Sequence, residues 1–128
     1  MLKTTTLGIV IEVDHWFRDD LSTEANSSFI HNYQIQIVNG TKYSVQLLSR
    51  EWNVKHLLHG ASQVIGEGVI GQQPILLPNE KFQYTSGCEI LTSIGSMSGK
   101  FYFRNTDTAE IFHADIPQFH LYFPPLLN

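Results

Sequence analysis

The strongest constraint on the fold is an alternation of apolar and polar residues with a period of two. The segment from Leu7 to Trp16 follows this pattern, and the segment from Phe29 to Val38 repeats it. In the first segment four aliphatic residues share one face: Leu7, Ile9, Ile11 and Val13. Successive side chains of a β-strand point to opposite sides, so both segments predict strands with one buried face. The polar residues between them, 18–28, predict a loop.

Shorter apolar runs follow later in the chain and are separated by turn-forming residues. Pro78-Asn79 is one such separator, and Asn105-Thr106-Asp107 predicts the turn of a hairpin. The runs lie at residues 75–77, 82–84, 101–104, 111–116 and 119–123. Many short strands with frequent turns favour an all-β sandwich or barrel. A length of 128 residues fits one domain spanning residues 1–128.

The segment from Val45 to Gly60 allows two interpretations. As a helix it would place Leu48, Trp52 and Lys55 on one face and end at Gly60. As a strand it would supply Trp52 as a core aromatic residue, a common feature of the third strand of a sandwich. Periodicity alone leaves both interpretations open.

Three motifs occur in a recognisable order: LLSREW at 47–52, GEGVIGQQPIL at 66–76 and FQYTSGC at 82–88. Met97, Gly99 and Tyr102 add an M-x-G-x-Y-like segment, with Phe101 at the usual aromatic position. Together these motifs resemble the ApaG family in its bacterial stand-alone form. The resemblance extends from about Leu7 to the end of the chain.

The resemblance implies an immunoglobulin-like or fibronectin type III-like sandwich of two antiparallel sheets. It also implies that residues 45–60 form a strand followed by a hairpin. The family is linked to cobalt and magnesium homeostasis, which is a phenotype and names no biochemical activity. Three departures concern loops: Glu89 stands where proline usually follows the cysteine, Thr92-Ser93 stands where Thr-Pro is usual, and residues 55–60 replace an Asp-containing turn.

Charge and cysteine content exclude several classes of protein. The net charge is −4, and the eight Lys and Arg residues are scattered singly, so no basic stripe for nucleic acid is present. No apolar run approaches the ~20 residues of a membrane span, and no signal peptide is apparent. Cys88 is the single cysteine and makes no internal disulfide, so we expect a cytoplasmic protein.

Gly66, Gly68 and Gly71 form a G-x-G-x-x-G motif. Pro74 and the surrounding β-type sequence argue against the dinucleotide fold in which this motif opens a helix. One remaining interpretation is a tight or bulged connection that uses the glycines' backbone freedom. The other is a phosphate or pyrophosphate site built from backbone amides, with Arg50 as its charge partner. A Gly68→Asp substitution would then abolish binding and leave the fold intact.

Two weak metal-ligand pairs occur. His56 and His59 are three residues apart, and His113 and Asp115 share one face of a predicted strand. Neither pair supplies the three or four ligands of a defined metal site. We therefore expect no cofactor, and a divalent cation is retained only as an alternative.

No catalytic residues are expected. Ser86 and Cys88 offer a hydroxyl and a thiol, but a nucleophile elbow and an identifiable base are missing. A hydrolase is therefore a remote alternative, and we predict a non-enzymatic binding or regulatory module whose partner is another protein. Homo-oligomers through edge strands are a further possibility. Trp16, Phe17 and the aromatic tail 119–123 would anchor a partner if exposed, and otherwise belong to the core.

Overall fold

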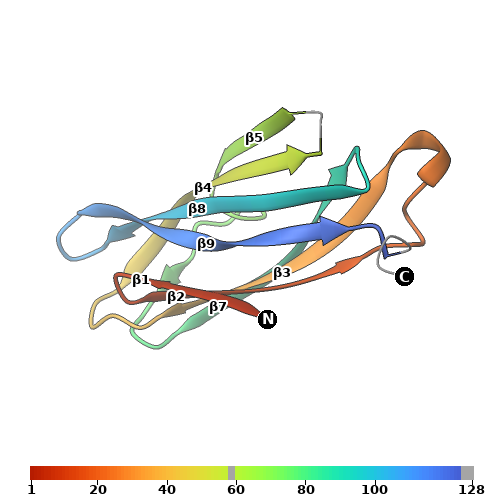
Figure 1. Cartoon of the computed structure of the whole chain (residues 1–128). Coiled ribbons are helices and arrows are strands. Elements are labelled where there is room, and N and C mark those ends of the chain that lie inside the picture. Colours follow the sequence, from red (N-terminus) through yellow and green to blue (C-terminus); the bar gives the residue numbers. More distant parts are fainter. Residues whose placement is uncertain (58–59, 125–128) are drawn as a thin grey trace.

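The computed structural model describes residues 1–57 and 60–124, which form a sandwich of two antiparallel sheets (Figure 1). One sheet has the order β1-β2-β3-β7, and the other has the order β5-β4-β8-β9 with β6 also paired to β4. The strands are β1 (Leu2–Thr6), β2 (Ile9–Phe17), β3 (Phe29–Asn39), β4 (Val45–His56), β5 (Gly60–Glu67), β6 (Ile75–Leu76), β7 (Lys81–Ile90), β8 (Ile94–Asn105) and β9 (Ile111–Tyr122). A 3₁₀ turn, η1, covers Glu24–Asn26. This architecture confirms the predicted all-β sandwich. Among the described residues, no helix has the length and hydropathy needed to cross a membrane.

The alternating residues of β2 and β3 form the centre of the core. Ile9, Ile11 and Val13 are at most 1% exposed, as the period of two predicts. Leu7 is an exception, because it is 68% exposed and lies with Gly8 in the turn between β1 and β2. The prediction that the first strand includes Leu7 was therefore wrong. Strand β1 was not predicted, since most of its residues are exposed and it shows no buried alternation.

The ambiguous segment forms β4 and the start of a hairpin, so the helical interpretation was wrong. Trp52 is 2% exposed and packs between the two sheets. Its ring centroid lies 5.2 Å from that of Tyr33 in β3, and 6.4 and 6.0 Å from those of Phe101 and Phe119. Since these three rings come from three other strands, burial of Trp52 fixes the segment as a strand. Leu58 and His59 lie outside the described residues.

The predicted late hairpin joins β8 to β9. The side-chain oxygen of Asn105 accepts hydrogen bonds from the N–H groups of Asp107 and Thr108, which closes the turn. Strand β9 then continues through Pro117, where Pro117 and Gln118 together oppose one residue of β8 and form a bulge. Proline is tolerated there because β9 is the outer strand of its sheet.

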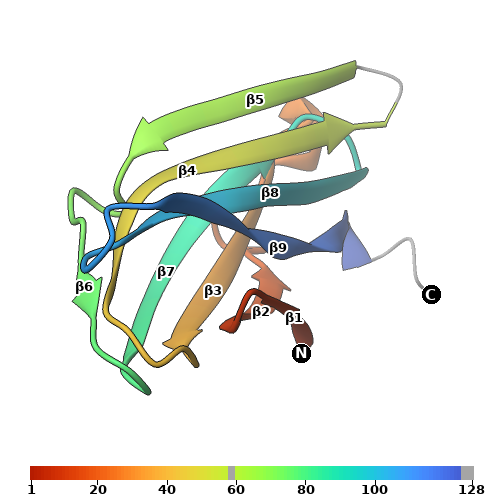
Figure 2. The ribbon, with the colours of Figure 1, turned by 90° about the vertical axis from the view of Figure 1, so that its left-hand side faces the viewer.

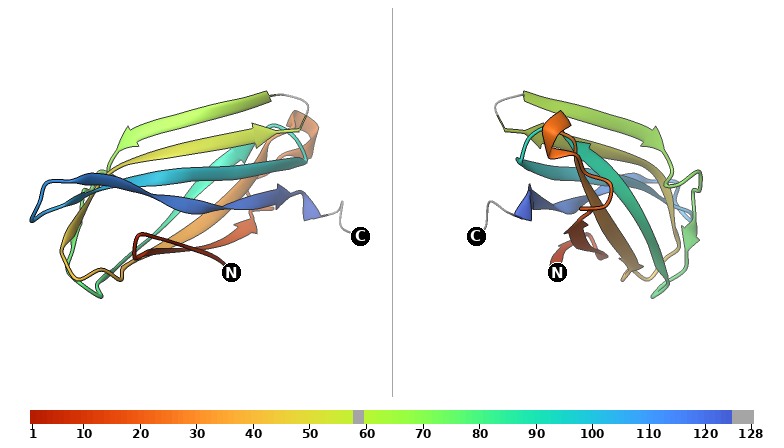
Figure 3. Two further views of the ribbon diagram at one scale, coloured as in Figure 1. Left: turned by 60° about the vertical axis from the view of Figure 1, so that its left-hand side comes forward. Right: turned by 90° about the vertical axis from the view of Figure 1, so that its right-hand side faces the viewer.

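The two long sides of the sandwich differ. On one side β1 contacts β9: the Thr4 hydroxyl donates to the Asp115 carbonyl, and the Asp115 N–H donates to the Thr6 hydroxyl. These contacts close the gap between the sheets. On the other side the outer strands are β5 and β7, and β5 lies away from the four-stranded sheet (Figures 2 and 3). The sandwich is therefore closed along β1 and β9 and more open along β5 and β7.

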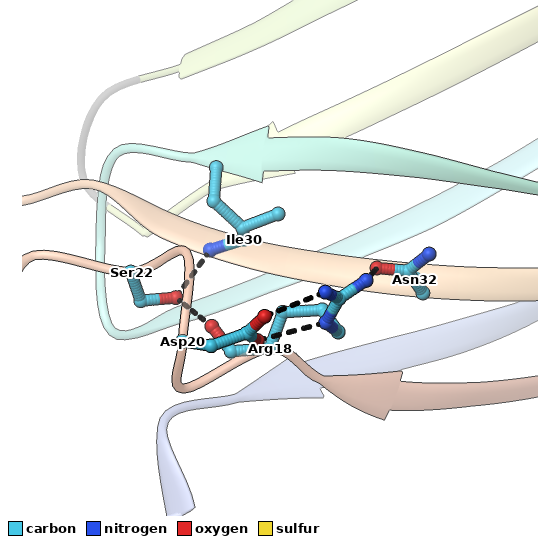
Figure 4. A network of polar contacts seen from close by, with 5 residues as sticks. All are labelled: Arg18, Asp20, Ser22, Ile30 and Asn32. Atoms are coloured by element: carbon cyan, nitrogen blue, oxygen red, sulfur yellow. Dashed lines mark hydrogen bonds and ion pairs between the residues drawn. The ribbon is translucent and has the colours of Figure 1, made fainter.

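The predicted loop after β2 is held by a polar network (Figure 4). Arg18 makes a two-bond ion pair with Asp20, with N–O distances of 2.9 and 2.7 Å, and also donates to the Asn32 side chain at 3.2 Å. The Ser22 hydroxyl donates to the Arg18 carbonyl and accepts from the Ile30 N–H. These bonds connect the acidic segment to β3.

Asn39 organises the opposite end of β3 and is fully buried. Its amide nitrogen donates to the carbonyl oxygens of Tyr43 and Leu76, at 2.8 and 2.9 Å. Its side-chain oxygen accepts from the N–H and hydroxyl groups of Thr41. Each side-chain donor and acceptor of Asn39 is thus satisfied, and the residue ties β3 to β6 of the other sheet.

His31 makes the fold sensitive to acid. Burial, with a smaller repulsion from His15, lowers the pKa of His31 from 6.5 to about 4. Between these two pH values the unfolded chain binds a proton that the folded chain does not, so stability falls as pH decreases. We expect His31 to account for a loss of up to about 3 kcal/mol in the free energy of unfolding between pH 7 and pH 4.

Denaturant unfolding at pH 7, 6, 5 and 4 measures this loss. His31→Phe should show a clearly smaller decrease than the unmodified chain across the same range. Part of the slope should persist, because burial also lowers the pKa of His15. An identical pH dependence in the two proteins would contradict the assignment to His31.

Candidate functional site

A cavity of about 200 Å³ lies at the open side of the sandwich. Arg50, Trp52 and Val54 of β4 line it from one sheet, and residues 86–88 of β7 line it from the other. Val64 of β5 borders it as well. Period-two geometry explains why Arg50, Trp52 and Val54 share this face of β4. The cavity therefore collects side chains from segments that are distant in the sequence.

Arg50 lies between this cavity and the glycine motif. It pairs in register with Gly66, and a Cβ atom at Gly66 would lie 2.9 Å from the Arg50 Nη2 atom. The absence of a side chain at Gly66 thus leaves space for the guanidinium. The Arg50 Nη1 group donates to the carbonyl oxygens of Gly68 at 2.8 Å and Glu67 at 3.3 Å. The structure brings Arg50 and the motif together, with the arginine bound to carbonyl groups of the loop.

The glycine motif forms a tight connection anchored to a bulge in β4. The pairing of β4 with β8 shifts at Leu48, whose carbonyl accepts from the Gly68 N–H at 2.7 Å and from the Gln73 side chain at 2.8 Å. Val69 is buried and exchanges two backbone hydrogen bonds with Gln72. The N–H groups of Gly68, Val69 and Gln72 are therefore engaged within the protein.

This geometry leaves fewer donors for an anion than the sequence suggested, and the phosphate site stays a prediction. The N–H groups of Ile70 and Gly71 make no hydrogen bond within the part of the chain that the structure describes. The expectation that Gly68→Asp would preserve the fold is wrong. Gly68 has φ +60°, and an added Cβ would overlap the Gln72 carbonyl oxygen.

Cys88 faces the cavity with a protonated thiol. Its Sγ atom lies 3.2 Å from the Sδ atom of Met97, and burial raises the Cys88 pKa to about 12. Burial also raises the pKa of Tyr33, opposed in part by a hydrogen bond with Ser86. Since the thiolate is the nucleophilic form of cysteine, this environment suits packing and hydrogen bonding better than nucleophilic attack.

The raised pKa predicts a slow reaction of Cys88 with thiol reagents. At pH 8 the thiolate fraction should be about a thousand-fold below that of a cysteine with a pKa of 9. Labelling with iodoacetamide, followed by mass spectrometry, should be correspondingly slow in the folded protein and fast in denaturant. Equal labelling rates in both states would contradict the buried, protonated thiol.

Of the first candidate metal pair, His56 lies among the described residues and His59 does not. The His56 Nδ1 atom accepts a hydrogen bond from the Leu91 N–H at 3.1 Å, and His59 lies outside the described residues. His56 instead lines a second hollow of about 290 Å³ with Lys55 and His120.

The second pair does lie together on β9. The distance between His113 Nε2 and Asp115 Oδ1 is 3.9 Å, and both side chains are about half exposed. Within residues 1–57 and 60–124, no three or more His, Cys, Asp or Glu side chains gather as a metal-binding group. Metal binding at these positions stays a prediction.

Most of the proposed aromatic anchors belong to the core. Phe119 and Leu121 are buried, and Phe17 packs against Phe123 with ring centroids 5.5 Å apart. Trp16 differs, because it is 41% exposed. The core interpretation therefore applies to Phe17 and to Phe119, Leu121 and Phe123 of the tail, whereas Trp16 and Tyr122 lie at the surface.

Strand β5 is a second surface feature that the sequence did not single out. Its residues 60–66 carry neither charge nor proline, and Val64 and Ile65 are 47% and 68% exposed. Charged residues or proline are the usual protection of edge strands against pairing. The charged residue of β5 is its last, Glu67, whereas other outer strands carry Lys3 in β1, Lys81 and Glu89 in β7, and Asp115 and Pro117 in β9.

Comparison with known proteins identifies the family. Residues 19–105 match the ApaG domain. The chain belongs to the ApaG family. Protein ApaG of Methylorubrum extorquens (strain PA1) is 40% identical over 126 residues, which cover 98% of this chain and 96% of that protein. Protein ApaG of Brucella canis is 35% identical over 124 residues, which cover 97% of this chain and 95% of that protein.

Solved structures agree with the family assignment. A crystal structure described as an ApaA protein from Bordetella pertussis superposes with a TM-score of 0.86 at 31% identity. The superposition covers 91% of this chain and 94% of that chain. A protein from Archaeoglobus fulgidus shares the fold alone, with a TM-score of 0.53 at 5% identity. The family resemblance and the sandwich expected from it are thus confirmed.

Proposed function

We propose that this ApaG-family chain is a non-enzymatic binding module that pairs an extended segment of a partner protein with the free edge of β5. The observation that carries the proposal is the uncharged, exposed stretch 60–66 with Val64 and Ile65 at its surface. An outer strand presents unpaired N–H and C=O groups along its length. A partner strand satisfies these groups, and side-chain contacts supply the specificity.

The composition of the four outer strands supports the choice of β5. Strands β1, β7 and β9 each contain charged residues or a proline that discourage pairing, and β1 also contacts β9, whereas the one charged residue of β5 is Glu67 at its end. Strand β5 has eight residues, which is long enough for several ladder hydrogen bonds. A role in cobalt and magnesium homeostasis, which the family resemblance implies, would be exercised through such a partner in the cytoplasm.

A charge placed on β5 tests the proposal. Ile65→Lys should prevent strand addition because the ammonium group stays hydrated at the edge, and it should preserve the fold because Ile65 is exposed. Ile111→Lys is the matched control, since Ile111 is a similarly exposed isoleucine on β9. The tagged protein and both variants would be used to retain proteins from host lysate, with quantification by mass spectrometry.

The expected result is a partner retained by the unmodified chain and by Ile111→Lys, and lost with Ile65→Lys. Hydrogen exchange with that purified partner should then show protection of amides in residues 60–67. Retention by all three proteins, or unchanged exchange in β5, would contradict the proposed edge. Size-exclusion chromatography with light scattering shows whether the partner is a second copy of this chain. In that case Ile65→Lys should disrupt the pairing of the two copies.

A further inference from the structure

The cavity beside β5 contains a cation without an anionic partner. Arg50 is half-buried, and its hydrogen bonds go to neutral carbonyl groups of Glu67 and Gly68. Within the described part of the chain, no carboxylate oxygen lies within 4.0 Å of its guanidinium. Charges removed from water are normally paired, so this arrangement favours an anion supplied from outside.

Trp52, which lines the same cavity, carries a buried hydrogen-bond donor. Trp52 is 2% exposed, and its Nε1 atom is one of two buried polar side-chain atoms that lack a partner among residues 1–57 and 60–124. Most buried donors in proteins are satisfied, so an exception at a cavity is consistent with an acceptor contributed by a ligand. The hydroxyl groups of Tyr33 and Ser86 add further polar contacts to the lining.

From these observations we infer that the cavity binds a small monoanionic carboxylate with a short hydrocarbon chain, held by Arg50. The guanidinium fork matches a carboxylate in geometry. Among the described residues that line the cavity, Arg50 alone is charged, so a single negative charge is balanced there and a phosphate dianion is not. The inference goes beyond the proposed function, because it concerns the cavity and needs no strand pairing.

The rest of the lining accommodates the hydrocarbon chain. Val54, Val64 and Met97 present apolar side chains, and Cys88 presents a protonated thiol. A volume of about 200 Å³ exceeds the space needed by one water molecule and suits a ligand of several heavy atoms. The cavity thus combines a polar group for orientation with an apolar wall, as small-molecule sites commonly do.

Nuclear magnetic resonance titration of the ¹⁵N-labelled protein tests the inference. The probes are 3-methylbutanoate, its uncharged amide 3-methylbutanamide, inorganic phosphate, and an acetylated tripeptide ending in a free valine carboxylate. Trp16→Phe assigns the two indole N–H signals. We expect 3-methylbutanoate to produce saturable shifts of the Trp52 indole signal and of the backbone N–H signals of β4 and β7. We expect 3-methylbutanamide to produce none of these shifts.

Three variants separate the cavity from nonspecific binding. Arg50→Gln should weaken 3-methylbutanoate binding at least tenfold. Arg104→Gln should leave the binding unchanged, because Arg104 lies outside the cavity, where its guanidinium donates a hydrogen bond to the Gln46 side chain. Because Arg50 also holds the loop, Val64→Phe provides a second variant that fills the cavity and retains the arginine. Val64→Phe should also weaken 3-methylbutanoate binding. Thermal unfolding of Arg50→Gln and of Val64→Phe verifies that both variants fold.

The outcomes are decisive in both directions. Saturable shifts that depend on the carboxylate and on Arg50 support the inference. Tighter binding of the tripeptide would identify a protein C-terminus as the source, and tighter binding of the free acid would identify a metabolite. Equal binding of the amide, tighter binding of phosphate, unchanged affinity in Arg50→Gln, or no shift at millimolar concentrations would each overturn it. None of these results depends on a partner strand pairing with β5.

Discussion

Replacing Gly99 with alanine is expected to lower the free energy of unfolding by at least about 3 kcal/mol, or to prevent folding. Gly99 lies in β8 directly opposite Trp52 of β4. An added Cβ would overlap the Glu51 carbonyl oxygen and would lie 3.2 Å from the Trp52 Cα atom. These are backbone atoms of a central strand, so relief of the overlap would require separation of β4 and β8.

Guanidinium denaturation followed by far-ultraviolet circular dichroism measures this loss. Gly71→Ala is the matched control, because a Cβ at Gly71 meets no atom within 4 Å. The control should lose only about 1 kcal/mol, which reflects the unfavourable φ of +70°. Similar losses in the two variants would show that close strand approach at Gly99 is not what the fold requires.

Replacing Asn39 with alanine should have a comparable effect, a loss of about 3 kcal/mol or more. The substitution removes the donors to the Tyr43 and Leu76 carbonyl oxygens and the acceptor of two bonds from Thr41. Each buried group left unsatisfied costs about 1–3 kcal/mol. The same denaturation experiment measures the change.

Asn39→Asp distinguishes the hydrogen bonds from simple loss of volume. The aspartate would place a second oxygen against two carbonyl oxygens, which should raise its pKa. The folded state would then hold a proton that the unfolded state releases, so the variant should become more stable relative to the unmodified chain as pH falls. A loss independent of pH in Asn39→Asp would contradict this account.

Much of the fold could be predicted because the core strands of the sandwich alternate. The alternation of Ile9, Ile11 and Val13, and of the corresponding residues in β3, follows directly from burial of one sheet face. Segment 45–56 could not be assigned from periodicity, because β4 bulges at Leu48 and carries Arg50 on the same face as Trp52 and Val54. Its strand character depends on contacts of Trp52 with three distant rings, which no local pattern contains.

The candidate site was predicted only in part. The sequence associated Arg50 with the glycine motif, and the structure places the arginine against that loop. The sequence could not show that N–H groups of the loop already donate hydrogen bonds within the protein, since one of these bonds goes to the Leu48 carbonyl at the bulge. The cavity was not predicted, because Trp52, Ser86 and Cys88 come together only when the two sheets pack. Strand β5 was not predicted because nearly all of its residues are exposed, so no alternation of buried and exposed residues marks it as a strand.

The contact between β1 and β9 has a practical and evolutionary consequence. The first and last strands of the sandwich lie on the side opposite the cavity and the β5 edge. A tether that enters through β1 or leaves through β9 therefore departs from the side opposite the proposed binding surface. This arrangement permits fusion to other domains, and immobilisation of the chain on a sensor through either end, without obstruction of the side on which we propose that a partner and a ligand bind.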